Sequence, residues 1–94
     1  MIIEKVAIRK VIQSIEGMML SHWEELGEVE NNTPKLELDI NLLYRMEDAG
    51  RYQLYVCYHK GNIVGYIGYI ITNGLHTSSV LYVTTDAMYI LPEY

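Results

Sequence analysis

The chain has 94 residues, half of them hydrophobic, which excludes a disordered chain and is enough for one small domain. Its net charge of −5 argues against a nucleic-acid-binding protein, which normally carries a basic surface. No hydrophobic run approaches the ~20 residues of a membrane helix, and the start lacks the pattern of a signal peptide. The single cysteine, Cys57, fits a reducing compartment. We therefore expect one cytoplasmic domain, residues 1–94, that binds neither nucleic acid nor membrane.

The first half of the sequence predicts one strand and two helices. A short β-branched run is followed by hydrophobic residues at steps of three and four, the period of an amphipathic helix. Asp39 is placed as the N-cap of a second helix, and Gly50 follows its end. The expected elements are a strand at Ile2–Ile8, a helix from Lys10 to about Leu26, a loop at Gly27–Leu36 and a helix at Ile40–Ala49.

The second half reads as three strands joined by short turns. Tyrosine, valine and isoleucine dominate these runs, and Lys60-Gly61-Asn62 has the composition of a tight hairpin. Gly65 and Gly68 inside the middle run suggest a bulge or a close backbone approach. The expected strands are Tyr52–His59, Ile63–Thr72 and Val80–Leu91. The order β-α-α-β-β-β predicts an α+β fold, an antiparallel meander with two helices packed on at least one face.

Six short motifs occur in an order that resembles a known family. They are His22-Trp23-Glu24-Glu25, Leu38-Asp39, Glu47-Asp48-Ala49-Gly50, Gly61-Asn62-Ile63-Val64-Gly65-Tyr66, Leu75-His76 and the terminal Leu91-Pro92-Glu93-Tyr94. The set is similar to the N-terminal half of N-acetyltransferases of the GNAT superfamily, and to the small acetyltransferase-like proteins of phages and prophages. The resemblance implies a truncated GNAT-like fold.

The same resemblance bears on the cofactor. In the superfamily, a Gly/Arg-rich loop and a helix N-terminus after the fourth strand hold the pyrophosphate of acetyl-CoA. This sequence ends at Tyr94, before that loop would begin. We therefore expect no cofactor, unless a separate polypeptide or a longer chain supplies the missing half and with it an acetyl-CoA site.

Two classes of function follow. The first is a non-catalytic GNAT-like protein, encoded by a phage, that acts by protein–protein interaction. Its partner would be a host protein, and inhibition of a host enzyme or of a defence system such as CRISPR-Cas would be its role; this step rests on analogy of fold. The second is an N-acetyltransferase, or a fragment of one, that uses acetyl-CoA.

If the protein is an enzyme, the resemblance implies Asp86, His22 and Glu25 as the residues that contact the acceptor amine. A base must lie within hydrogen-bonding reach of that nitrogen. The alternatives are a surface or relic carboxylate at Asp86 and a solvated helix end anchored by Trp23. Simple alternation along the last strand predicts one face with the side chains of Thr84, Asp86, Met88 and Ile90.

Other reactive side chains give no pattern of a site. The three histidines, His22, His59 and His76, are too scattered for a metal-binding signature. Cys57 lies in the middle of a strand, without a base placed near it, and is interpreted as a small core residue. We expect no metal site.

Nine tyrosines and no phenylalanine make the composition unusual. Eight of the tyrosines fall in or beside the meander, where they suit either a binding surface or ordinary cross-strand packing. The last strand would have an open edge, which favours a homodimer through this strand or capture of a host protein by strand addition. The interaction residues expected on this strand and just after it are Tyr82, Thr84, Asp86, Met88, Tyr89 and Tyr94.

Overall fold

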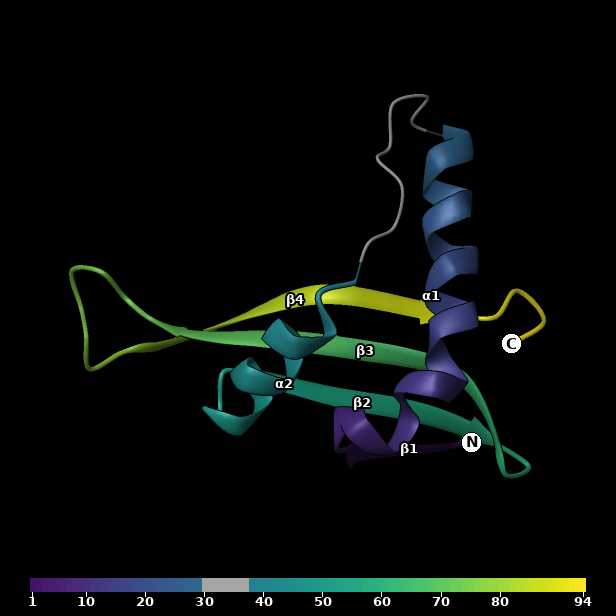
Figure 1. The fold of residues 1–94 in the computed structure, drawn as a ribbon, viewed down its shortest axis with the longest axis horizontal. Coiled ribbons are helices and arrows are strands. Elements are labelled where there is room, and N and C mark those ends of the chain that lie inside the picture. The colour runs from purple at the N-terminus through teal and green to yellow at the C-terminus, as the bar shows by residue number, and fades with distance from the viewer. Residues whose placement is uncertain (30–37) are drawn as a thin grey trace.

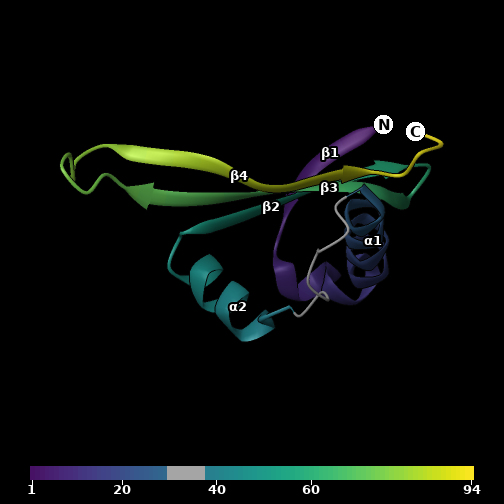
Figure 2. The ribbon, with the colours of Figure 1, turned by 90° about the horizontal axis from the view of Figure 1, so that it is seen from above.

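Two layers make up the structure, a computed structural model that describes residues 1–29 and 38–94: a four-stranded sheet, and two helices on one face of it (Figures 1 and 2). The predicted order β-α-α-β-β-β is confirmed. The elements are β1 (Ile2–Val6), α1 (Ile8–Val29), α2 (Ile40–Asp48), β2 (Tyr52–His59), β3 (Asn62–Asn73) and β4 (Leu81–Ile90).

The boundaries of the first helix differ from the prediction. Ile8 begins α1 instead of ending the first strand, because its backbone N–H donates to both carboxylate oxygens of Glu47, at 3.0 and 3.2 Å. A carboxylate at this place satisfies a free N–H and complements the helix dipole. The helix also continues to Val29, into the segment expected as a loop, and the rest of that predicted loop lies outside the described residues.

The second helix forms as the sequence predicts. Asp39 is its N-cap, and Oδ1 accepts a hydrogen bond of 3.0 Å from the N–H of Leu42. Gly50 follows the end of α2 with a φ of 71°, a conformation that glycine adopts without steric penalty.

The sheet is the predicted antiparallel meander, with the strand order β1-β2-β3-β4. The turn between β2 and β3 uses positive φ values at Lys60 and Gly61. Two register shifts interrupt the pairing. The shift in β3 and β4 decides the geometry of the site: Gly68 pairs with Ala87 and Tyr69 pairs with Thr85, so Asp86 is an extra residue, a β-bulge.

At Gly65 the backbone of another strand comes close, as predicted, whereas at Gly68 the close group is a side chain. A Cβ at Gly65 would lie 2.7 Å from the backbone oxygen of Tyr89 in β4. A Cβ at Gly68 would overlap the hydroxyl of Tyr52, whose ring carbon Cζ would be only 2.8 Å away. Neither position has room for a side chain.

The core fills the space between α1 and the sheet. One stripe of α1 and the inward side chains of three strands bury each other, which is the main stabilising contribution in a domain of this size. The buried residues of this cluster are Ile8, Val11, Ile12, Ile15, Tyr52, Leu54, Val56, Tyr66 and Tyr89.

The two faces of the sheet are covered unequally. Figure 2 shows both helices on the same side, while no described element covers the other face. In Figure 1, α1 runs across the strands and its C-terminal end extends beyond β4. The hairpin of β3 and β4 projects past the helices at the opposite end from the C-terminus.

Candidate functional site

A pocket of about 270 Å³ lies on the helix-covered face, where the second half of α1, the start of α2 and the bulge of β4 meet. This volume suits a small group or the end of a longer ligand, because drug-sized ligands occupy about 300–1,000 Å³. The lining is mostly aromatic and aliphatic, and besides the tyrosine hydroxyls its polar groups include the imidazole of His22 and the carboxylate of Asp86. The other lining residues are Met19, Trp23, Leu38, Leu43, Tyr52, Tyr66 and Ala87.

Asp86 is held in this pocket by a tyrosine from a strand that is not its neighbour. The Tyr52 hydroxyl donates a hydrogen bond of 2.9 Å to Oδ2 of Asp86. No hydrogen bond to Oδ1 is found among the described residues, and the Asp86 side chain is exposed. One oxygen of this exposed carboxylate is therefore fixed by Tyr52, and no described residue holds the other by a hydrogen bond.

A second polar group links the end of α1 to β3 and β4. His22 stacks on the ring of Tyr89 at a centroid distance of 4.9 Å, and its Nδ1 lies 3.2 Å from the Tyr66 hydroxyl. The Tyr89 hydroxyl donates a hydrogen bond of 3.0 Å to Oε1 of Glu25. These contacts fasten α1 over the site and leave His22 at the pocket wall.

Burial and nearby charge keep the tyrosine hydroxyls of this group protonated. Burial raises the pKa of Tyr66 to about 12, helped by Tyr89 and Asp86. Burial, followed by the hydrogen bond to Glu25, also raises the pKa of Tyr89. The pKa of Tyr52 is raised by burial and then by the Asp86 charge. At neutral pH all three hydroxyls are available as donors.

Most of α1 and all of β3 and β4, which line the pocket, lack basic residues. Lysine and arginine do not occur in residues 11–34 or 61–94 of the sequence, which include most of α1, all of β3 and all of β4. β4, which carries Asp86, therefore has no lysine or arginine, and in α1, which carries Glu25, the two basic residues Arg9 and Lys10 lie in the first turn, at the other end of the helix. A positively charged group suits this side of the molecule better than an anion.

An anion site for the pyrophosphate of acetyl-CoA does not fit the described residues. Helix N-termini bind phosphate groups through free backbone N–H groups. In each described helix, a carboxylate of the chain itself already accepts from one such group: Glu47 from the N–H of Ile8 in α1, and Asp39 from the N–H of Leu42 in α2.

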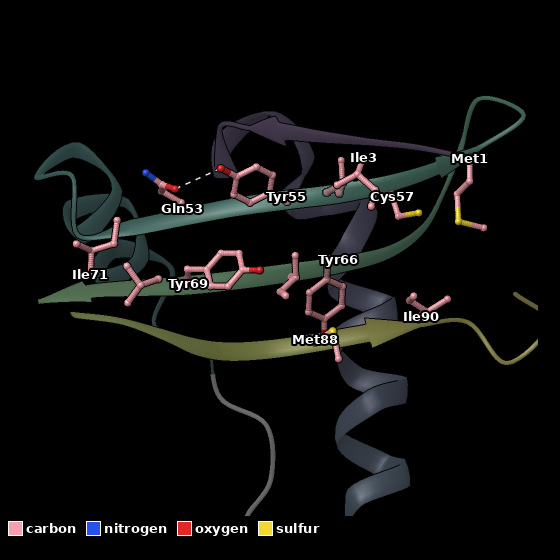
Figure 3. Close-up of a pocket in the computed structure, with 13 residues that line it drawn as sticks. Met1, Ile3, Gln53, Tyr55, Cys57, Tyr66, Tyr69, Ile71, Met88 and Ile90 are labelled. Carbon is pink, nitrogen blue, oxygen red and sulfur yellow. Dashed lines mark hydrogen bonds between the residues drawn. The ribbon is translucent and has the colours of Figure 1, made fainter. Parts of the chain in front are cut away.

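The uncovered face of the sheet carries a larger hollow, of about 600 Å³, seen in Figure 3 with the helices behind the strands. None of its lining side chains is charged, and Tyr55 and Tyr69 pack edge to face across it at 5.9 Å. The apolar residues of β4 on this face are Val83, Met88 and Ile90. Exposed apolar surface of this extent is typical of a site that another molecule covers.

Comparison with known proteins identifies the fold. Searches against protein-family models and against curated proteins found no match. A solved structure, the ribosomal-protein-alanine N-acetyltransferase from Brucella melitensis biovar Abortus 2308, matches with a TM-score of 0.72 and 14% sequence identity. The match covers 99% of this chain and 59% of that protein.

The fold is GNAT-like. At 14% identity the match concerns the backbone arrangement alone, and it confirms the predicted GNAT-like α+β architecture. The chain spans somewhat less than two thirds of the length of the acetyltransferase that it matches.

Within this GNAT-like fold, the three residues expected for an enzyme lie near one another. Asp86 and His22 line the same pocket, and Glu25 is joined to it through Tyr89. The alternation predicted for β4 is wrong beyond the bulge. Asp86 lies on the helix-covered side, whereas Met88 and Ile90 line the opposite face.

The residues expected for interaction are spread over both faces. Tyr82, Thr84 and Met88 are exposed, and Tyr82 lies within hydrogen-bonding distance of Thr77. Tyr89 is only 8% exposed and packs against α1, so its ring is not part of an open surface. Tyr94 is half exposed and its ring contacts His59.

Sequence reasoning missed Tyr52 and Tyr66 as site residues, because tyrosines in strands are most often packing residues. The glycine at position 68 was the available signal, since it marked a place where something crosses the strand. Cys57 is a buried free cysteine, as predicted. Within the described ranges, no group of three or more potential metal ligands is found, and no helix could span a membrane.

Proposed function

We propose that the chain is the acceptor-binding part of a GNAT-like N-acetyltransferase and that it binds a protonated amine at Asp86. The observation that carries this proposal is the half-open carboxylate: Oδ2 is held by Tyr52, and Oδ1 faces no partner among the described residues. The matched structure is a ribosomal-protein-alanine N-acetyltransferase, which makes a small amine such as an amino-terminal alanine the natural acceptor to test.

The roles of the residues follow from the geometry. The Asp86 carboxylate pairs with the ammonium group and can accept its proton, which an amine must lose before it can act as a nucleophile. Met19 and Trp23 of α1 and Leu43 of α2 supply apolar contacts for the rest of the acceptor. An acetyl donor would be held by polypeptide outside the described residues.

Amine binding can be tested by titrating the ¹⁵N-labelled protein with alanine amide and following amide chemical shifts by NMR. We expect saturable shifts around Asp86 and His22, and none with N-acetyl-alanine amide, which has no positive charge. The variant Asp86→Asn should abolish the shifts. The matched control Asp48→Asn removes the same charge at an exposed ion pair remote from the pocket and should bind as the wild type does. Equal binding by Asp86→Asn would overturn the proposal.

A second candidate function is the non-catalytic binding protein, and the uncovered apolar face favours it. β4 is an edge strand with no charged residue except Asp86, and its exposed side chains include Leu81, Tyr82, Val83, Met88 and Ile90. Such an edge and face invite a partner, either a second copy paired through β4 or a host protein. For a phage-encoded chain, inhibition of a host enzyme or of a CRISPR-Cas complex belongs to this candidate.

Calorimetry and light scattering separate the two candidates. The binding-protein function predicts no heat with millimolar acetyl-CoA and, at micromolar protein, twice the monomer mass. Thr85→Pro should reduce the mass to that of a monomer. Micromolar affinity of the 94-residue chain for acetyl-CoA would exclude this candidate, and a dimer unaffected by Thr85→Pro would exclude pairing through β4.

A further inference from the structure

The hydrogen bond between Tyr52 and Asp86 crosses a whole strand. Tyr52 begins β2 and Asp86 lies in β4, and β3 runs between them. The Tyr52 side chain lies across β3 on the helix-covered face, and only 6% of it is exposed. A buried hydroxyl in such a position needs a partner, and Asp86 provides it at 2.9 Å.

Gly68 makes this crossing possible. It pairs with Leu54 in β2 and with Ala87 in β4, so it lies between the two ends of the hydrogen bond. Any side chain at this position would occupy the space of the Tyr52 hydroxyl and of its ring carbon Cζ. The glycine is therefore required by the path of the tyrosine and not by its own backbone conformation, since its φ is not in the left-handed region.

The β-bulge brings the carboxylate to the end of this path. Because Asp86 is the extra residue between the pairs of Thr85 and Ala87, its side chain lies on the helix-covered side, next to that of Ala87. With regular alternation the carboxylate would share a face with Met88, on the uncovered side and away from Tyr52. Bulge, glycine and tyrosine thus combine to place one carboxylate.

We propose that Tyr52 is the positioning residue for Asp86: its hydroxyl fixes Oδ2, leaves Oδ1 for the ammonium group of the ligand, and depends on Gly68 for access. This inference rests on the proposed amine-binding function and adds how the carboxylate is held. A carboxylate fixed before the ligand arrives loses less side-chain freedom on binding than a mobile one. Burial and the Asp86 charge raise the pKa of Tyr52 further above physiological pH, so its hydroxyl is a donor there.

The test compares two tyrosines of the same strand. Tyr52→Phe removes the hydroxyl, and Tyr58→Phe makes the same chemical change at the far end of β2, away from the pocket. In the NMR titration with alanine amide, Tyr52→Phe should weaken binding about tenfold, the usual range for a lost hydrogen bond to a charged group. Tyr58→Phe should bind as the wild type does. Wild-type affinity in Tyr52→Phe would overturn the inference.

A second readout does not depend on any ligand. In protein labelled with ¹³C at the tyrosine Cζ, the Tyr52 signal should titrate at lower pH in Asp86→Asn than in the wild type, because the charge and the hydrogen bond are both lost. A merely structural tyrosine would not respond. An unchanged titration of Tyr52 would show that the hydroxyl does not hold the carboxylate, and would contradict the inference.

Gly68→Ala examines the path itself. If it folds, judged by an intact amide spectrum, it should weaken alanine amide binding as Tyr52→Phe does, and the double variant should be no weaker than either single one. Full additivity of the two changes would contradict a shared path. The outcomes separate the two proposals: loss of binding in Asp86→Asn together with wild-type binding in Tyr52→Phe would retain the amine site and reject the positioning role.

Discussion

Both faces of the sheet carry tyrosines, but the tyrosines are placed differently on the two faces. On the helix-covered face, Tyr52, Tyr66 and Tyr89 are buried, and two of them donate hydrogen bonds to carboxylates. On the uncovered face, Tyr55 and Tyr69 form an apolar edge-to-face pair over an open hollow. One composition thus serves a polar pocket on one side and an apolar surface on the other.

This difference teaches that the role of a tyrosine here depends on what covers it. Below α1, a buried hydroxyl must find a partner, so the rings arrange carboxylates and a histidine into a site. On the open side, the rings of Tyr55 and Tyr69 pack together, and the Tyr55 hydroxyl donates a hydrogen bond of 3.4 Å to Oε1 of its strand neighbour Gln53 (Figure 3). Stability should therefore depend on the first face and association on the second.

The largest expected effect comes from shortening a core residue under α1. Ile15 is fully buried, and Ile15→Ala should lower the free energy of unfolding by about 3 kcal/mol, from lost burial and the cavity left behind. Met88→Ala on the uncovered face should change it by less than about 0.5 kcal/mol, because Met88 is 62% exposed. Urea denaturation of both variants measures this contrast. Equal losses would mean that the uncovered face is also part of the core in solution.

The second-largest expected effect is a loss of folding stability at alkaline pH, caused by the tyrosines of the helix-covered face. The pKa of Tyr66 is 10.0 in the unfolded reference and about 12 in the fold, so the folded state retains a proton that the unfolded state loses. Its contribution to stability is complete below pH 10 and is lost as the pH rises toward 12. The pKa of Tyr52 is also raised, so Tyr52 contributes to stability in the same direction.

Denaturation curves between pH 8 and 12 measure this slope. Tyr66→Phe should flatten it, whereas Ile12→Val should lower stability by a similar amount at every pH. A wild-type slope retained in Tyr66→Phe would show that Tyr66 does not contribute to it.

A smaller effect is expected at the start of α1. Glu47 accepts hydrogen bonds from the N–H of Ile8, and Glu47→Ala should destabilise the protein by about 1 kcal/mol, as the loss of a helix cap does. Glu16→Ala, at an exposed position of the same helix, is the matched control and should be nearly neutral. Thermal unfolding by circular dichroism compares them. A neutral Glu47→Ala would mean that water replaces the carboxylate without loss.

The smallest effect belongs to the exposed ion pair of Arg9 and Asp48, 3.0 Å apart. The hydrogen bond from Arg9 holds the pKa of Asp48 below its usual 3.8, so this contribution is present above that pH and is lost as the pH falls through the lower, folded value. Exposed pairs contribute little, and salt screens them. At low salt, Asp48→Asn should therefore slightly reduce stability at neutral pH, the difference should disappear as the pH falls below the folded pKa of Asp48, and it should vanish at any pH in 1 M NaCl. A difference that persists there would indicate a role other than charge.

Much of the fold could be predicted from the sequence, because its local signals agree with its global arrangement. The bounds of β2 were predicted residue for residue, since turn chemistry at Gly50 and at Lys60-Gly61 brackets it. The start of α1 could not be predicted, because its cap, Glu47, comes from an element 39 residues away. A cap from a distant part of the chain gives no signal in the sequence next to the helix.

The site shows the same limit. The resemblance pointed to Asp86, His22 and Glu25, and the structure brings them together around Tyr89 and the pocket. The face on which Asp86 lies was predicted incorrectly, because alternation assumes two residues per repeat and a bulge adds one. The partnership with Tyr52 depends on pairing across two strands, which periodicity does not reveal.

The bulge at Asp86 has a practical consequence for anyone who redesigns this protein. Odd-numbered and even-numbered residues of β4 exchange faces at the bulge. Val83, before the bulge, and Met88, after it, both lie on the face away from the helices. A mutant library chosen by alternate positions along β4 would begin on one face of the sheet and finish on the other. Removing residue 86 alone would reset that count, and the same deletion would erase the carboxylate, so reversing the strand and keeping the acid are mutually exclusive edits.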